Sequence, residues 1–277
     1  MSDARRDRLA GLLADAAERF GVTIDGEPVR GSYDRTLAVR ASGPAWLRVT
    51  AQEPRWAQGL YWDGIATATG PPFGGIPMPP HLRSAEWVER WDDVDQVVRA
   101  DLIGYVDEPA VGSGLVLDHA VDLPDAWWAG LRAGLGILRR VTVTERRVLQ
   151  PDVVRSSVLA LFGVDIDLDR VDWEVAHGDL HFGNLTAPRL TILDWEYWGW
   201  APAGYDAAVL ACSAVLQPDV AARVRAEFAD VLGTYSGAVA QLAAADKYLR
   251  LVGIGAYPEI AVPVRRQAET LIRERFA

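Results

Sequence analysis

The apolar positions change their period along the chain, which divides it into a β-rich first part and a helical second part. Residues 7–20 carry apolar side chains at the three- and four-residue spacing of a helix, and Gly21 is expected to end it. Residues 26–52 instead hold short β-rich runs separated by turn residues, which predicts three antiparallel strands. These runs centre on Val29, on 37–39 and on 46–49.

The rest of the pattern predicts one more helix, two more strands and then a helical region. The helix is expected over 54–68, with Pro54 in its first turn, and the strands over 87–90 and 97–106. Residues 175–200 are expected to form loops and short strands between the later helices. Those helices are expected at 126–140, 153–162, 206–216, 219–231, 236–252 and 261–275.

This order of elements predicts an α+β chain of two lobes. The first, residues 1–104, would hold one helix and a small five-stranded antiparallel sheet, and the second, residues 105–277, would be mainly helical. The longest uncharged apolar run, near 207–216, is too short to cross a bilayer. Acids and arginines interrupt the N-terminus, which therefore lacks a signal-peptide core, and Cys212 is the only cysteine. We expect a cytoplasmic protein without membrane contact.

The net charge and the choice of basic residues limit the chemistry of the protein. A formal net charge of −10 disfavours nucleic acid as a partner and is compatible with a cationic small molecule. Lys247 is the only lysine among the 28 basic residues of the chain, and all the others are arginine. A mechanism that needs a lysine must therefore use Lys247 or do without one.

Two neighbouring segments carry candidate chemistry, His177–Asn184 (HGDLHFGN) and Leu190–Glu196 (LTILDWE). The apolar residues 190–193 are expected to form a strand that delivers Asp194 at its end. Asp179 could then face a reacting hydroxyl, while an amide oxygen of Asn184 and the carboxylate of Asp194 hold a hard cation such as Mg²⁺. This division of roles is the one that phosphoryl transfer requires.

The two segments resemble the catalytic and metal-binding loops of the aminoglycoside phosphotransferases, which are small-molecule kinases with a protein-kinase-like fold. Residues 200–206 (WAPAGYD) are similar to the G-D-P-x-x-D-L-A segment of that family, and residues 75–79 resemble its proline-bearing link to the fourth strand. Residues 131–141 resemble its L-x-x-L-H-x-V helix, with Arg139 at the usual histidine. The resemblance covers about 26–210 and implies a bilobal kinase fold.

The resemblance also implies roles for residues of the second lobe. Asp179 would be the catalytic base, Asn184 and Asp194 would hold Mg²⁺, His177 would brace the catalytic loop through its backbone, and Asp206 would be a buried structural acid.

Two further residues are candidates for substrate contact. Glu196 stands two positions after Asp194, so in an extended chain its side chain points to the same side as that of Asp194. It could therefore contact the metal or the substrate. The alternative is that Glu196 is a surface carboxylate. Trp198 belongs to an aromatic cluster that could stack on the acceptor, although buried packing is the simpler interpretation.

The first lobe departs from the family pattern. Arg48 occupies the strand position of the family's phosphate-binding lysine, and Asp63 is the candidate partner for it; a solvated strand face is the alternative. Ser32 could donate to a phosphate, although an ordinary polar hairpin explains its segment equally well. A hinge is expected near residues 100–105, where the backbone of Leu102 and Ile103 would meet the adenine edge.

The sequence therefore predicts a Mg²⁺-dependent phosphotransferase, monomeric or homodimeric. It would move the γ-phosphate of ATP or GTP to a hydroxyl of a small molecule, such as an aminoglycoside-like antibiotic or a related metabolite. One alternative is a catalytically degenerate kinase-like protein that binds a nucleotide or metabolite, or acts as a scaffold, because the strand lysine is missing and Lys247 lies in the helical half. The other is a metal hydrolase built on the His177-x-Asp179-x-His181 spacing.

Overall fold

The computed structural model of the protein describes residues 3–31 and 35–276. The chain divides into two compact units, one formed by 1–69 and 78–107, the other by 70–77 and 108–277. The crossing at 107–108 falls close to the boundary expected from the pattern, but the segment 70–77 belongs to the second unit rather than the first. A five-stranded antiparallel sheet and a mostly helical part confirm the α+β bilobal class.

The strands predicted from the short β-rich runs form the sheet of the first unit. All its neighbouring strands are antiparallel, in the order β1-β2-β3-β5-β4. Their bounds are β1 Val29–Arg30, β2 Thr36–Ala41, β3 Ala45–Gln52, β4 His81–Trp91 and β5 Val94–Gly104. Alternate residues of a strand face opposite sides, so β3 buries Leu47 and Val49 completely on one face and turns Arg48 to the other.

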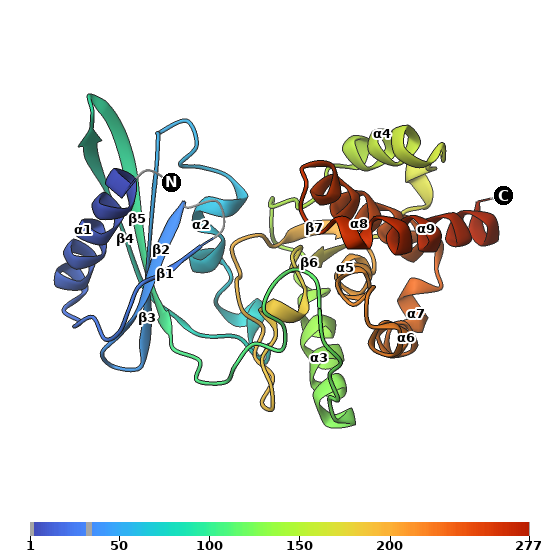
Figure 1. Ribbon diagram of the computed structural model, residues 1–277, viewed down its shortest axis with the longest axis horizontal. Coiled ribbons are helices and arrows are strands. Elements are labelled where there is room, and N and C mark those ends of the chain that lie inside the picture. The colour runs from blue at the N-terminus through green and yellow to red at the C-terminus, as the bar shows by residue number, and fades with distance from the viewer. Residues whose placement is uncertain (1–2, 32–34, 277) are drawn as a thin grey trace. The chain divides into compact units, whose positions relative to one another are not determined.

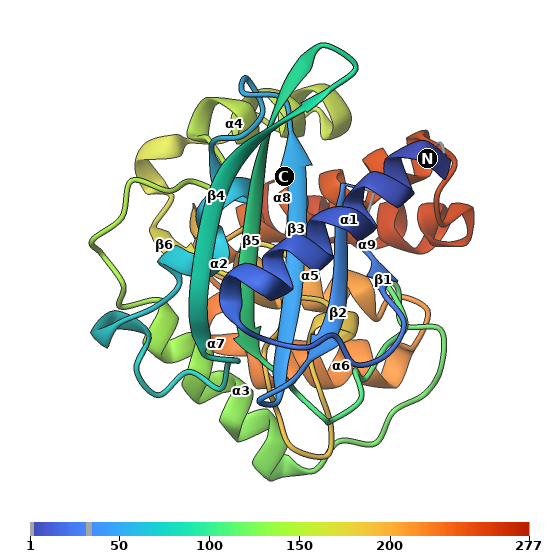
Figure 2. The same ribbon diagram turned by 90° about the vertical axis from the view of Figure 1, so that its left-hand side faces the viewer.

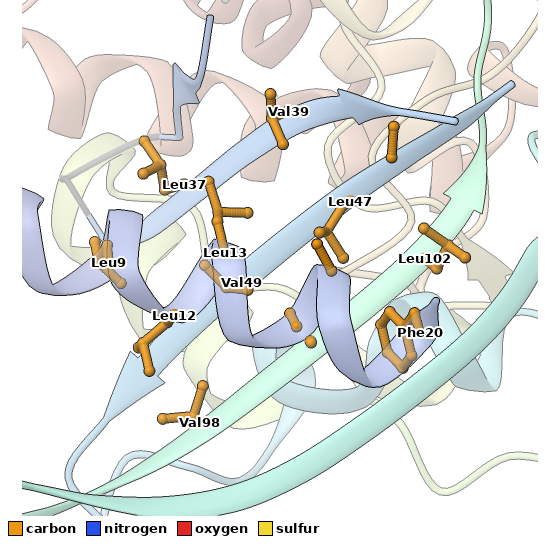
Figure 3. Close-up of a cluster of buried hydrophobic side chains, with 14 of the residues drawn as sticks. Leu9, Leu12, Leu13, Phe20, Leu37, Val39, Leu47, Val49, Val98 and Leu102 are labelled. Atoms are coloured by element: carbon orange, nitrogen blue, oxygen red, sulfur yellow. The ribbon is translucent and has the colours of Figure 1, made fainter. Parts of the chain in front are cut away.

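Helix α1 (Asp3–Phe20) provides the cover for the apolar face of the sheet. It lies across the strands in Figure 2, and its buried side chains interdigitate with those of β2, β3 and β5 in Figure 3. Leu9 and Leu13 are almost fully buried in this core, which is the amphipathic packing that the spacing of residues 7–20 predicted. Helix α2 (Leu60–Thr67) lies on the opposite face of the sheet (Figure 1).

Three predicted elements differ in the structure. Helix α2 begins at Leu60 rather than at Pro54, because residues 53–57 form a turn and Gly59 precedes the helix at φ +80°. The expected strand at 190–193 is reduced to a single bridge between Leu185 and Ile192. The expected helix at 219–231 is interrupted at Phe228.

The second unit is built around α8, a long central helix. Helix α8 packs against α4, α5, α7, α9 and strand β7, and most of its side chains between Ser236 and Leu249 are buried. The helices are α3 Asp125–Leu138, α4 Pro151–Phe162, α5 Tyr205–Ser213, α6 Pro218–Glu227, α7 Ala229–Leu232, α8 Tyr235–Gly253 and α9 Ala261–Arg275. A two-stranded sheet of β6 (Trp173–Ala176) and β7 (Gly199–Pro202) completes this unit. No helix of the described residues is both long and apolar enough to span a membrane.

Candidate active site

Residues 177–184, the predicted catalytic loop, begin where β6 ends, and a buried carboxylate anchors the first two of them. Asp206, at the start of α5, accepts hydrogen bonds from the backbone N–H of His177 at 2.8 Å and of Gly178 at 2.9 Å. Burial raises the pKa of Asp206 to about 6. Gly178 adopts φ +82°, and a Cβ at this position would collide with the carbonyl oxygen of Tyr197. Asp206 thus has the buried structural place that the resemblance implied.

The ring of His177 joins the catalytic loop to the segment that carries Asp194. It is fully buried, and its Nε2 donates to the carbonyl oxygen of Leu193 at 2.8 Å while its Nδ1 accepts from the N–H of Asp179 at 3.4 Å. Both the backbone and the ring of His177 thus contact neighbouring segments, and its bracing role in catalysis stays a prediction. Both ring nitrogens face protein partners, which disfavours the metal-hydrolase alternative because that reading needs a histidine nitrogen as a ligand.

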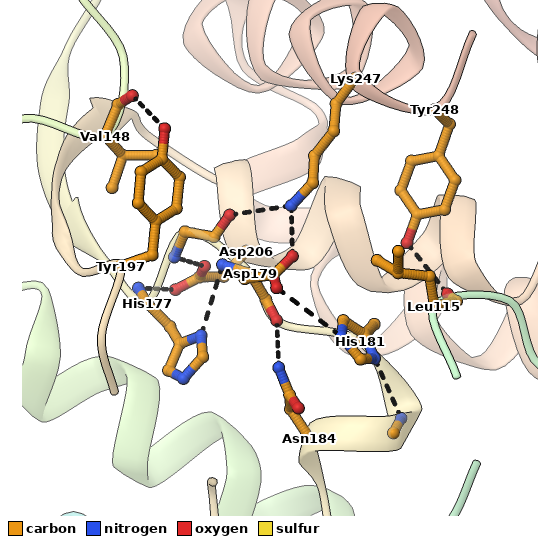
Figure 4. A network of polar contacts seen from close by, with 12 residues as sticks. Leu115, Val148, His177, Asp179, His181, Asn184, Tyr197, Asp206, Lys247 and Tyr248 are labelled. Atoms are coloured by element: carbon orange, nitrogen blue, oxygen red, sulfur yellow. Dashed lines mark hydrogen bonds and ion pairs between the residues drawn. The ribbon is translucent and has the colours of Figure 1, made fainter. Parts of the chain in front are cut away.

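The carboxylate of Asp179 is held by two side chains, as Figure 4 shows. Lys247 Nζ donates to Asp179 Oδ1 at 2.5 Å and to the carbonyl oxygen of Gly178 at 3.2 Å, and His181 Nε2 lies 3.7 Å from Oδ2. Burial by itself raises the pKa of the Asp179 carboxyl, but the Lys247 ammonium and the His181 ring outweigh it, so this pKa lies below its ordinary value. Asp179 is therefore an ionised carboxylate at neutral pH.

The sequence analysis did not connect Lys247 with the candidate base. Lys247 lies in the helical half, as expected, on α8, and the structure brings it into contact with Asp179. The two residues stand 68 positions apart, so no local motif joins them. The available signal was that Lys247 is the only lysine of the chain.

Asn184 and Asp194, the two predicted metal ligands, lie on hydrogen-bonded segments. Leu193 N donates to the carbonyl oxygen of Asn184 at 2.8 Å, and Asp194 follows directly, exposed and at φ +61°. The side-chain Nδ2 of Asn184 donates to the carbonyl oxygen of Asp179 at 2.9 Å, so the amide oxygen is the atom of this side chain that could bind a cation. An amide oxygen and a carboxylate suit Mg²⁺. In the described part of the chain, no cluster of three or more His, Cys, Asp or Glu could hold a metal ion.

The chain after Asp194 turns instead of extending, which overturns the geometric argument for Glu196. Residues 195–197 form a turn, and the backbone carbonyl of Glu196 accepts from Arg146 Nη2 at 3.0 Å. Alternation of side chains applies only to an extended strand, so Glu196 is not placed on the side of Asp194 by spacing. Trp198 is 3% exposed and packs edge-on against Phe73 at 5.0 Å between ring centroids, which is the buried packing weighed against acceptor stacking.

Phe73 and its neighbours also explain why the segment 70–77 belongs to the second unit. In addition to the Phe73–Trp198 contact, the N–H of Ile192 donates to the carbonyl oxygen of Pro77 at 2.7 Å. The segment therefore packs on the loop that carries Asp194.

In the first unit, Arg48 lies on the sheet face opposite α1, directly across from Asp101 of β5. Asp101 is 2% exposed, and Arg99 holds it through Nε and Nη2, both at 3.0 Å. Burial raises the pKa of Asp101, but His81, Arg99 and Arg48 lower it below its ordinary value. Asp63, the expected partner of Arg48, is on α2, and the Arg48–Asp63 pair stays a prediction.

The remaining nucleotide candidates are placed as follows. Leu102 and Ile103 lie inside β5, with β3 on one side and β4 on the other. Strand pairing continues to Gly104 and the chain leaves the unit at 107–108, so the hinge near 100–105 stays a prediction. The backbone contact of these two residues with adenine remains a prediction. Ser32 lies outside the described residues.

The buried ring of His177 leads to a pH-dependent contribution to stability. Burial lowers its pKa from 6.5 to about 4, so between these values the unfolded chain binds a proton that the folded chain does not. The contribution of His177 is therefore fully present above pH 6.5 and is lost as the pH falls toward 4. Urea unfolding at several pH values should show the wild-type advantage over His177→Gln growing as the pH rises through this range. His119→Gln, at an exposed histidine, is the matched control. A constant difference between wild type and His177→Gln would contradict the prediction.

Comparison with known families finds a match to part of the chain. Residues 119–244 match the model of the phosphotransferase enzyme family. The matched stretch contains Asp179, Asn184 and Asp194, so the resemblance seen in the motifs is confirmed there. None of the curated proteins matches the chain at a significant level.

Solved structures share the fold over nearly the whole chain. A thermostable mutant of aminoglycoside phosphotransferase APH(4)-Ia in its apo form is 14% identical, with a TM-score of 0.58, and the alignment covers 95% of this chain and 98% of that one. A choline/ethanolamine kinase family protein from Mesorhizobium loti is 15% identical, with a TM-score of 0.54 over 97% of this chain and 95% of that one. Amicoumacin kinase hAmiN, in complex with AMP-PNP, Ca²⁺ and Ami, is 14% identical, with a TM-score of 0.53 over 98% and 95%.

At these identities the likeness establishes the kinase-like fold, which the motifs implied. Together, the family match and the kinase neighbours support a small-molecule kinase enzyme.

Proposed function

We propose that the protein transfers the γ-phosphoryl group of ATP or GTP to a hydroxyl of a small molecule in a Mg²⁺-dependent reaction. The observation that carries this proposal is the hydrogen-bonded arrangement of Asp179, Asn184 and the Leu193–Asp194 segment. One ionised carboxylate with two nearby oxygen donors for a hard cation matches the division of roles in phosphoryl transfer.

In the proposed reaction, Asp179 accepts a hydrogen bond from the acceptor hydroxyl and orients its oxygen. The acceptor oxygen forms a bond to the γ-phosphorus, the bond from that phosphorus to the β–γ bridging oxygen breaks, and its electron pair leaves with the nucleoside diphosphate. The hydroxyl proton passes to the Asp179 carboxylate. Because the pKa of Asp179 is lowered, it serves mainly to orient the hydroxyl and takes the proton late, as a loose transition state allows. Mg²⁺, held by Asn184 and Asp194, would neutralise negative charge on the phosphate oxygens.

Arg48 supplies the positive charge on the strand where the family carries a lysine, and we propose it as a phosphate ligand. Its guanidinium keeps the charge in a planar, forked form. Two similar solved structures are complexes, one with ADP and hygromycin B and the other with GDP and kanamycin. These complexes support a purine nucleotide and a hydroxylated small molecule as the two substrates.

Calorimetric titration of ATP and GTP tests the nucleotide half of the proposal. The wild type should bind one or both nucleotides, and more tightly with Mg²⁺ than without it. Asp194→Asn should weaken the Mg²⁺-dependent binding by at least about tenfold, because it removes a charged oxygen ligand.

The matched control is Asp165→Asn, the same exchange at an exposed carboxylate paired with Arg155 in the same unit. It should bind nucleotide as the wild type does. Two results would contradict the proposal: absence of nucleotide binding by the wild type at millimolar concentration, or equal Mg²⁺ dependence in Asp194→Asn and wild type. The first result would favour the catalytically degenerate alternative.

A further inference from the structure

The contact between Lys247 and Asp179 joins the one lysine of the chain to the proposed base. Lys247 projects from α8, and Asp179 stands in the loop after β6 (Figure 4). The two side chains are 24% and 30% exposed, so the pair is partly shielded from water. A partly shielded ion pair is stronger than one on the open surface.

Helix α8 presents Lys247 from a firmly packed position. Its neighbour Tyr248 is fully buried, and the Tyr248 hydroxyl donates to the carbonyl oxygen of Leu115 at 3.2 Å. On the other side of Lys247, Asp246 accepts from Arg250 Nε at 2.9 Å. The nearest carboxylate on the helix is thus engaged by an arginine, while the lysine reaches across to the catalytic loop.

The contacts of Lys247 distinguish the two oxygens of Asp179. The ammonium donates to Oδ1 and to the carbonyl of Gly178, which ties the side chain and the backbone of the loop to one point. The other oxygen, Oδ2, lies on the side of His181, whose Nδ1 in turn accepts from the N–H of Gly183 at 3.2 Å. An unconstrained carboxylate could rotate and exchange its oxygens, and this arrangement opposes that rotation.

We infer that Lys247 is a positioning residue for phosphoryl transfer, which holds Oδ1 of Asp179 so that Oδ2 meets the acceptor hydroxyl. This inference rests on the proposed function. Placement errors of about 1 Å in a reacting group can cost roughly 10²-fold in rate, so the loss of this anchor should act on turnover rather than on nucleotide affinity.

The single lysine allows a direct test of the ion pair that does not depend on activity. Protein labelled only with ¹⁵N-lysine has one side-chain Nζ signal, that of Lys247. Asp179→Asn should shift this signal and speed the exchange of its protons with water. Asp246→Asn, at the neighbouring carboxylate that pairs with Arg250, is the control and should leave the signal near its wild-type position. A signal that Asp179→Asn leaves unchanged would overturn the inference.

The second test measures turnover with water as the phosphoryl acceptor, through release of inorganic phosphate from Mg²⁺–ATP and Mg²⁺–GTP. Lys247→Met keeps the length of the side chain and removes its charge, and should lower kcat by about 10- to 100-fold with KM for the nucleotide changed by less than about threefold. Lys247→Arg should restore part of the rate, because it returns a cationic donor. Arg250→Met, an exposed position on the same helix, is the control.

The outcomes separate the inference from the proposed function. If wild type releases phosphate and Asp179→Asn does not, while Lys247→Met equals or exceeds the wild-type rate, the inference is overturned and the proposed function stands. Equal rates in wild type and Asp179→Asn would overturn both. If Lys247→Met fails to fold, Lys247→Arg and the labelled-lysine measurement still decide: the inference then requires a shifted signal in Asp179→Asn and retained turnover in Lys247→Arg.

Discussion

Exchanging Asp179 for asparagine is expected to lower the turnover number by about 10²- to 10⁴-fold, the range in which a positioned general base contributes. Asparagine has nearly the same shape but carries no charge and cannot take the acceptor proton. Nucleotide affinity should stay close to the wild-type value, because the proposed metal ligands are Asn184 and Asp194. Phosphate release from Mg²⁺–ATP, followed together with calorimetric nucleotide binding, measures both quantities.

The control for this exchange is again Asp165→Asn, which removes one exposed carboxylate from the same unit. Its turnover should equal that of the wild type. Retention of most of the activity by Asp179→Asn would remove Asp179 from the role of base, and with it the proposed mechanism. A parallel loss of nucleotide binding would instead indicate that Asp179 contributes to the metal site.

Among the proposed substitutions, Asp206→Ala is expected to lower the free energy of unfolding the most. Asp206→Ala leaves the buried N–H groups of His177 and Gly178 without their acceptor. Each buried group left unsatisfied costs about 1–3 kcal/mol, so losing the acceptor of both groups should lower the free energy of unfolding by roughly 2–6 kcal/mol. Urea unfolding at constant pH gives this difference directly.

Asp206→Asn keeps one acceptor oxygen and should lose less than Asp206→Ala. Asp165→Ala, which breaks only the exposed pair with Arg155, should leave the free energy of unfolding close to that of the wild type, because a solvent-exposed ion pair contributes little. A loss below about 1 kcal/mol for Asp206→Ala would mean that water replaces the carboxylate at these two N–H groups. The loop would then not depend on the buried acid for its anchorage.

Most of the elements, and a chemical class for the site, could be predicted from the amino-acid pattern. Short β-rich runs bounded by turn residues predicted the strands around Val29, 37–39 and 46–49. Helical spacing predicted α1, since an amphipathic helix can cover such a sheet. The order of Asp179, Asn184 and Asp194 indicated a phosphotransferase, and the family match covers this stretch.

Local patterns failed where a conformation depends on what packs nearby. The extended chain assumed for Glu196 is a turn that follows the positive φ of Asp194, and the helix assumed from Pro54 begins only after Gly59. In both places, periodicity in the sequence cannot reveal the reversal of the backbone. The segment 70–77 was assigned by its position in the chain, whereas its contacts with the second unit decide where it belongs.

Which charged groups meet depends on the packing of segments that are distant in the sequence. Lys247 reaches Asp179 because α8 packs beside the catalytic loop, and Asp101 stands across from Arg48 because β3 and β5 are neighbours in the sheet. Such contacts depend on the register and packing of distant segments, which a local pattern does not encode. Electrostatic interaction falls with distance, so the pKa of a carboxyl such as Asp179 follows from neighbours in space rather than from neighbours in sequence.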